Sequence, residues 1–233
     1  MLKNPFKTLT KKEYALWIIS FTVVIISNLI TGKYDIFTLL GTSVGVTALI
    51  FVAKGNVWGE ILSVIFSILY AITSYEFRYY GEMITYLGMT MPLGIISVVS
   101  WLKHPSEENG AEVKIHILSR LERVLLWVLT AGITFIFYFI LKYFDTPNLA
   151  VSTISIATSF SACYLGFFRS PYYAVCYAAN DIVLIILWVL ASMEDLSYFP
   201  MIICFVMFLV NDIYGFISWK LREKKQIRSI MKK

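Results

Sequence analysis

Two Asn-Asp pairs, Asn180-Asp181 and Asn211-Asp212, stand inside hydrophobic runs that are each long enough to cross a bilayer. A carboxylate near the centre of a membrane helix costs roughly 2.5–3.5 kcal/mol on insertion scales, so it usually faces a protein interior or a water-filled cavity. The two pairs therefore predict a polar site between membrane helices, of the kind that moves a polar solute.

Around the first pair, helical spacing puts Tyr177, Asp181, Leu184 and Trp188 on one face, with Asn180 on its flank. A buried carboxylate with an aromatic ring two turns away suits a flat cation, because the carboxylate neutralises the charge and the ring offers a cation–π contact. Asn180, Asp181 and Trp188 are therefore candidate substrate-binding residues. The alternative is that Asp181 hydrogen-bonds a neighbouring helix and Trp188 belongs to an aromatic belt at the membrane surface.

The second pair offers Asn211 and Tyr214, whose amide and hydroxyl groups suit ring hydroxyls or an amide of the substrate. Asp212 lies closer to the end of its run, so we expect it to serve a gate or the fold. Glu60 begins the hydrophobic run over 58–76 and has two interpretations. It faces the inner mouth of a solute path, or it caps the helix start, where a negative charge suits the helix dipole, and the cap is favoured.

Pro92 interrupts the hydrophobic run over 82–101. Proline removes one backbone hydrogen bond and frees the carbonyl of Gly88, which predicts a kink or hinge. Tyr86 and Thr90 fall near this kink on roughly one face. Both are candidate substrate-binding residues, and they come from a part of the chain far from the two Asn-Asp pairs.

The composition indicates the class of protein that holds these residues in place. The 233 residues are 58% hydrophobic and 15% charged, with a mean hydropathy of +0.73. A soluble domain carries about 25% charged residues and about 45–50% apolar ones. The chain is therefore predicted to be an all-α polytopic membrane protein with eight spans, at about 14–30, 36–53, 58–76, 82–101, 124–141, 149–168, 172–192 and 199–219.

No catalytic motif or metal-ligand spacing stands in these spans, so we expect neither an enzyme nor a cofactor or metal site. Cys163, Cys176 and Cys204 fall inside spans and are interpreted as small apolar fillers. The chain also lacks a phosphate-cradling glycine loop, which argues against a pump driven by ATP alone.

Charge predicts the orientation. With both termini in the cytoplasm, 17 of the 20 Lys and Arg residues lie on the inner side, and the outer loops carry the remaining 3. The basic balance thus follows from topology and anionic lipid rather than from nucleic acid. Five tryptophans fall at the inner ends of spans and are predicted to form an aromatic belt: Trp17, Trp58, Trp101, Trp127 and Trp219.

An internal repeat relates two groups of three spans. Trp101 and Trp219 stand 118 residues apart in similar Ser-Trp contexts, and the same offset relates Tyr70 to Trp188. Four crossings separate equivalent positions, so the repeat is parallel, with its axis along the membrane normal. The predicted single membrane domain has these parts in order: an extra helix (14–30), a first bundle (36–101), a linker helix (124–141), a second bundle (149–219) and a basic cytoplasmic tail (220–233).

Three features resemble the PnuC family of vitamin transporters: an N-x-W-G-E start to the third span (56–60), the NDIYGFISW ending of the eighth (211–219), and the three-plus-one-plus-three, SWEET-like plan. The resemblance is strongest to nicotinamide riboside transporters of the Gram-positive type. It implies facilitated diffusion of nicotinamide riboside, which is trapped after uptake by cytoplasmic phosphorylation. It further implies substrate contacts from five residues: Asn180, Trp188, Asn211, Tyr214 and Tyr86.

The sequence departs from the family pattern at Thr85, Thr90 and Met91, where relatives are often richer in Gln, Tyr and Asn. The exact vitamin therefore stays open, and thiamine, which also carries a charged aromatic ring, is the first alternative. A proton-coupled carrier using Asp181 or Asp212 and a membrane scaffold or receptor are the other hypotheses. The expected partners are the bilayer, the small-molecule substrate and possible further copies of the chain, in the plasma membrane.

Overall fold

The computed structural model describes residues 4–30, 36–107 and 109–231, and in them the regular elements are all helices, apart from one isolated bridge between Pro105 and Val113. Eight helical segments are long and apolar enough to cross a membrane, which confirms the predicted spans. In order, the elements are η1 (Pro5–Thr8), α1 (Lys11–Ile30), α2 (Ile36–Lys54), α3 (Val57–Glu76), α4 (Tyr80–Thr85), the π-turn η2 (Tyr86–Thr90), α5 (Met91–Lys103), α6 (Arg120–Tyr143), α7 (Leu149–Phe167), α8 (Tyr173–Ser192), η3 (Leu196–Tyr198) and α9 (Phe199–Ile230).

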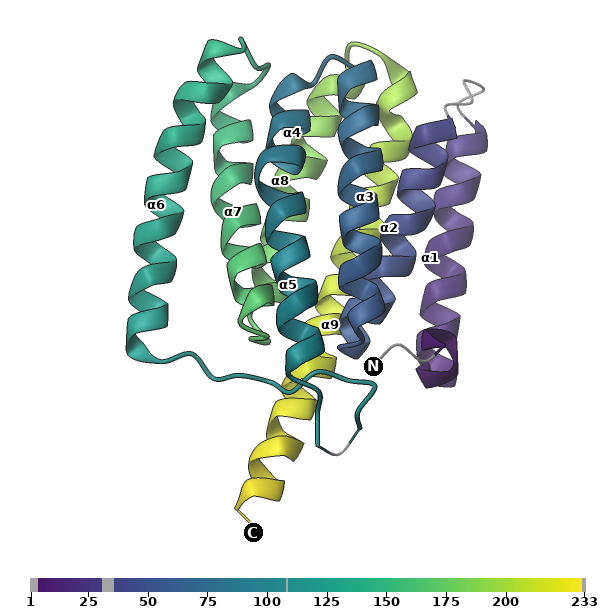
Figure 1. Cartoon of the computed structure of the whole chain (residues 1–233). Coiled ribbons are helices and arrows are strands. Elements are labelled where there is room, and N and C mark those ends of the chain that lie inside the picture. Colours follow the sequence, from purple (N-terminus) through teal and green to yellow (C-terminus); the bar gives the residue numbers. More distant parts are fainter. Residues whose placement is uncertain (1–3, 31–35, 108, 232–233) are drawn as a thin grey trace.

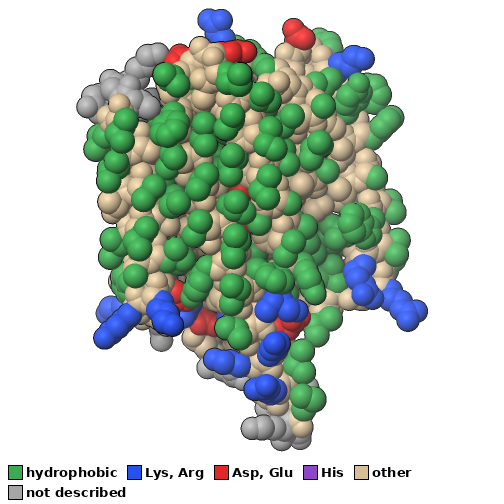
Figure 2. Space-filling view, turned by 180° about the vertical axis from the view of Figure 1, so that it is seen from behind, with side chains coloured by type: hydrophobic (Ala, Val, Ile, Leu, Met, Phe, Trp, Pro, Cys, Tyr) green, Lys and Arg blue, Asp and Glu red, His purple; other side chains and the backbone are tan. Residues whose placement is uncertain are grey.

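η1 and the carboxyl end of α9 lie at the same end of the bundle, which we call the terminal end, and α9 extends beyond the other helices there (Figure 1). On the face shown in Figure 2, hydrophobic side chains form a broad band between the two ends. Lys and Arg gather mainly at the terminal end of that view. This distribution is that of a protein whose band contacts lipid and whose ends contact water.

The two repeat units pack against each other reciprocally. In the first unit (α2, α3 and α4–α5), α2 packs against α9 and α5 packs against α7. Both pairings join the first helix of one unit to the last helix of the other. Such a reciprocal contact is what a pseudo-twofold axis along the bundle produces, as the parallel repeat predicts.

The turns that follow α2 and α7 show the repeat at the level of single hydrogen bonds. The backbone N–H groups of Asn56 and Ser170 each donate, at 2.9 Å, to the carbonyl five residues earlier. The residues before them, Gly55 and Arg169, have φ values of 70° and 56°. This is the Schellman arrangement that ends many helices, and here it recurs at an offset of 114 residues.

Trp101 and Trp219 are fully buried, so the prediction that they belong to a surface belt is wrong. Their ring centroids lie 5.5 Å apart between the two units. The Trp101 indole donates to the carbonyl of Gly166, and the Trp219 indole donates to that of Val52, both at 2.9 Å. Each ring is held by the opposite unit because the pseudo-twofold axis passes between them. Trp127 on α6 is 71% exposed, in keeping with the belt.

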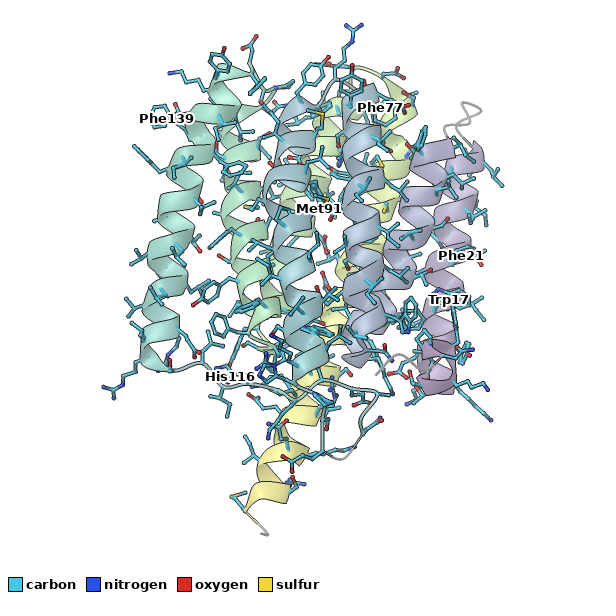
Figure 3. All side chains as sticks on the ribbon, in the orientation of Figure 1. Trp17, Phe21, Phe77, Met91, His116 and Phe139 are labelled. Carbon is cyan, nitrogen blue, oxygen red and sulfur yellow. The ribbon has the colours of Figure 1, made fainter. Side chains whose placement is uncertain are left out.

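Helices α1 and α6 lie at opposite sides of the bundle in Figure 1. α1 packs against α2 and α9, whereas α6 packs against α7 and leaves most of its surface exposed. Figure 3 shows Phe139 of α6 pointing away from the other helices. The six helices of the repeat therefore enclose whatever polar site the chain contains.

Pro92 interrupts the fourth span as predicted, and the interruption is a π-turn. The backbone N–H of Met91 donates to the carbonyl of Tyr86, five residues earlier. Because proline has no N–H and its ring crowds the carbonyl four residues before it, the helix widens by one residue at this point. Figure 3 places Met91 about halfway along the bundle.

Candidate functional site

A cavity of about 60 Å³ lies between the two repeat units, at the level of the π-turn. It is lined from the first unit by α2, α3 and η2, and from the second by α7, α8 and α9. Six of the ten predicted site residues reach it: Glu60, Tyr86, Thr90, Asn180, Asp181 and Asp212. The interface of two parallel units is where transporters of this architecture hold their substrates.

The cavity is acidic. Glu60, Asp181 and Asp212 line it and are each no more than 8% exposed. The carboxyl groups of Asp181 and Asp212 face each other within hydrogen-bonding range. Among its lining residues there is no Lys, Arg or His in the part of the chain that the structure describes. The cavity is therefore suited to a cation and unsuited to an anion.

Glu60 does not cap α3, so the favoured interpretation from sequence is wrong. The side chain of Asn56 occupies the cap position and accepts a hydrogen bond from the backbone N–H of Trp58 at 3.0 Å. Glu60 is one turn further along the helix and turns into the cavity. The Asn side chain satisfies the helix start, so the carboxylate of Glu60 is left for another role.

Two buried polar atoms in the cavity wall have no hydrogen-bond partner. They are Oδ2 of Asp181 and the hydroxyl Oγ1 of Thr90. Buried polar atoms are nearly always paired, so an unpaired atom on a residue that lines a cavity marks a place where a ligand can bind. A carboxylate oxygen and a hydroxyl from opposite units give a ligand one charged and one neutral contact.

Asn180 is held rigidly by the neighbouring helix. Its side-chain oxygen accepts hydrogen bonds from the hydroxyls of Thr158 at 2.8 Å and Ser159 at 2.9 Å, both on α7. The small polar residues of α7, expected mainly to allow close packing, thus also fix this amide. With its oxygen occupied, Asn180 presents its NH₂ group as the donor for a ligand.

Aromatic rings form one side of the cavity. Phe66 lies edge-on to Tyr86 and to Phe208, with centroid distances of 6.1 and 5.3 Å. Phe66 and Phe208 were not among the residues predicted from the sequence. Opposite these rings, Gly45 has no side chain, and a Cβ atom there would lie 2.4 Å from the tip of Phe208.

Trp188 does not reach the cavity, although it shares a helix face with Asp181. Seven residues correspond to about 10 Å along a helix, and the rings of Tyr86 and Tyr70 lie across that interval. The Trp188 indole donates to the Tyr70 hydroxyl at 3.0 Å. Together with three further rings they form an aromatic cluster toward the non-terminal end, whose members are Tyr70, Phe77, Tyr79, Trp188 and Tyr198.

Asn211 and Tyr214 also lie outside the cavity, because they occupy the face of α9 that packs on α1. The Asn211 amide donates to the Ser20 hydroxyl at 3.0 Å, and the Tyr214 hydroxyl donates to Glu13 at 3.0 Å. Both residues join the extra first helix to the second unit. The internal repeat relates α9 to the other repeat helices and gives no indication that α1 covers this face.

Charged side chains connect the helices at the terminal end, a feature that the sequence argument missed. Lys54 of α2 pairs with Glu13 at 3.2 Å, and Arg222 of α9 pairs with Glu112 of the α5–α6 loop at 2.9 Å. Lys54 also approaches Glu112 at 3.9 Å. These contacts join both repeat units, α1 and the loop, and they lie beside a second cleft of about 590 Å³. We call this set the terminal ion cluster.

This chain resembles a curated protein, a solved structure and a protein family. The "Nicotinamide riboside transporter PnuC" of Neisseria mucosa is 26% identical over 180 residues, which cover 75% of this chain and 68% of that protein. The "Crystal structure of the Vitamin B3 transporter PnuC" superposes with a TM-score of 0.80 at 22% identity, over 93% of this chain and 94% of the other. The profile of a family described as "Nicotinamide mononucleotide transporter" matches residues 35–221. This match includes both repeat units and all the cavity residues, and the chain therefore belongs to that family of membrane transporters.

Proposed function

We propose that the protein transports nicotinamide riboside across the plasma membrane, by facilitated diffusion. The observation that carries this proposal is the acidic cavity: three carboxyl side chains line it, and no basic side chain does so among the described residues. The pyridinium ring of nicotinamide riboside has a fixed positive charge, which such a cavity stabilises. The relative from Neisseria mucosa bears the same substrate in its name.

The same charges argue against the mononucleotide that appears in the family's description. A mononucleotide adds a phosphate group, and proteins bind phosphates with Arg, Lys or helix N-termini. In this cavity a phosphate would face Glu60, Asp181 or Asp212 instead. Thiamine is the second candidate, because it too carries a cationic ring and no phosphate.

Each substrate contact follows from the groups already placed. We assign the ring charge to Asp181, and the face of the ring to Tyr86 and its aromatic neighbours. Thr90 and Asn180 supply a hydroxyl and an NH₂ group for the ribose or the carboxamide. We propose that Trp188, Asn211 and Tyr214, predicted to bind substrate, act instead by holding helices in place.

The cavity is much smaller than the roughly 300–1,000 Å³ that drug-sized ligands occupy, so binding requires movement. The rings of Phe66, Tyr86 and Phe208 are the groups whose rotation would enlarge it. The aromatic cluster on one side and the terminal ion cluster on the other join the two units. We propose that these two sets separate alternately as the substrate passes, with the terminal end in the cytoplasm. Cytoplasmic phosphorylation would then trap the product.

The test is calorimetry on the purified protein with nicotinamide riboside, its mononucleotide and thiamine. We expect heat with the riboside and none with the mononucleotide. Binding of thiamine alone would refute the assignment of the substrate, and a folded protein that binds none of them would favour a scaffold or receptor. The control is Asp145→Asn, which removes an exposed carboxylate outside the cavity at a residue with φ of 50°, where Asn is tolerated.

In proteoliposomes, uptake of labelled riboside should follow the solute gradient and require no imposed pH gradient. Accumulation against the solute gradient, driven by an imposed pH gradient, would support the proton-coupled carrier in place of facilitated diffusion.

A further inference from the structure

The carboxyl groups of Asp181 and Asp212 lie close together, although two negative charges in this position would repel each other. The two carboxyl groups face each other within hydrogen-bonding range, and a hydrogen bond between two carboxyls requires a proton on one of them. Both side chains are 3% exposed, so water does not screen their repulsion. Two carboxylates at such short range do not both ionise.

Oδ2 of Asp181 is a candidate contact for a ligand. Asp181 lines the cavity, and its buried Oδ2 has no hydrogen-bond partner. The pair therefore presents a carboxyl group to the cavity even when one of its two members holds a proton. A cation that contacts Oδ2 supplies the positive charge that the proton otherwise provides.

Among the described residues, no Lys, Arg or His lines the cavity beside the pair. The titratable groups around the pair come from each helix packed against it, except α2, which contributes only apolar residues and Gly45 to the cavity. They are Glu60 on α3, Tyr86 on η2, Cys163 on α7, Tyr173 and Tyr177 on α8, and Cys204 on α9. All are acids, thiols or phenols, and the guanidinium of Arg222 acts on Tyr173 from the terminal side.

We propose that the Asp181–Asp212 pair shares one proton when no substrate is bound and releases it when the cationic ring binds. This inference rests on the proposed function and adds a regulation to it: proton and substrate cation compete for one site. No other reactant is needed, because the proton passes to water and the substrate charge replaces it. The affinity for the substrate should therefore fall as pH is lowered, because a larger fraction of the pairs then holds a proton.

The experiment is calorimetry of nicotinamide riboside binding at neutral pH in several buffers of different ionisation enthalpy. We expect the observed heat to vary linearly with buffer enthalpy, with a slope of close to one proton released for each substrate bound. The comparison ligand is reduced nicotinamide riboside, whose ring is neutral and of similar size. Any binding of this ligand should release no proton.

The variants Asp212→Asn and Asp212→Glu assign the proton. The amide of Asp212→Asn donates to Asp181 without a shared proton, so release should fall to near zero, while Asp212→Glu should keep it. Asp145→Asn is the control and should release as much as the wild type.

Three results would overturn the inference: riboside binding with no buffer dependence, equal release with the neutral ligand, or unchanged release in Asp212→Asn. In each of them the proposed function stands. A folded wild-type protein that binds no riboside at any pH overturns both.

Discussion

Gly45→Ala should close part of the cavity without unfolding the protein. An added Cβ at this position lies 2.4 Å from Cζ of Phe208 and 3.0 Å from the ring of Phe66. The atom nearest to the new methyl group is the tip of a side chain, so the Phe208 ring can shift, and the space beside it is the cavity. The substitution therefore moves the Phe208 ring into the cavity and reduces the space that is left for the substrate.

The magnitude follows from the cost of overpacking, about 1–3 kcal/mol for an extra methyl group in a tightly packed site. If the substrate must push the displaced Phe208 ring back, the whole overpacking energy is lost from the free energy of substrate binding. The affinity for the substrate then falls roughly 5- to 150-fold. Folding should suffer less, because alanine favours a helix over glycine by about 1 kcal/mol and offsets part of the strain.

The assay is the affinity for nicotinamide riboside by calorimetry, together with the thermal midpoint of the same preparation. Gly132→Ala on α6 is the matched control, because a Cβ there meets no atom within 4 Å. We expect the control to keep wild-type affinity. A folded Gly45→Ala protein with unchanged affinity would refute the placement of the substrate beside Phe208.

Asp181→Asn should weaken the free energy of riboside binding by about 2–5 kcal/mol, because a buried charge contact then loses one partner. A calorimetric affinity equal to that of the wild type would contradict this. Trp188→Phe removes the indole bond to a buried tyrosine hydroxyl and should destabilise by about 1–3 kcal/mol. Its thermal midpoint should fall by about 2–4 °C for each kcal/mol, with affinity kept within about threefold if Trp188 only holds helices. Glu13→Gln should lower the free energy of unfolding by about 1–3 kcal/mol, because Lys54 loses its nearer charged partner. The exposed pair of Glu107 is the control, and Glu107→Gln should change stability by less than about 1 kcal/mol.

Much of the architecture could be read directly from residue types and spacing. Runs of apolar residues define the eight spans because each must match the thickness of a bilayer. The cost of a carboxylate in lipid singled out Asp181 and Asp212 as residues of a polar interior, and both line the cavity. Pro92 marked the break in the fourth span, because proline cannot complete a helical hydrogen-bond ladder.

Only the tertiary structure decided which neighbour covers each helix face. Helical spacing placed Trp188 on the face of Asp181, but the rings of Tyr70 from α3 and Tyr86 from η2 come between them. Asn211 lies one residue before Asp212 and yet faces α1 instead of the cavity. Successive residues on a helix point about 100° apart, so sequence determines the faces themselves, whereas packing determines which face meets the substrate.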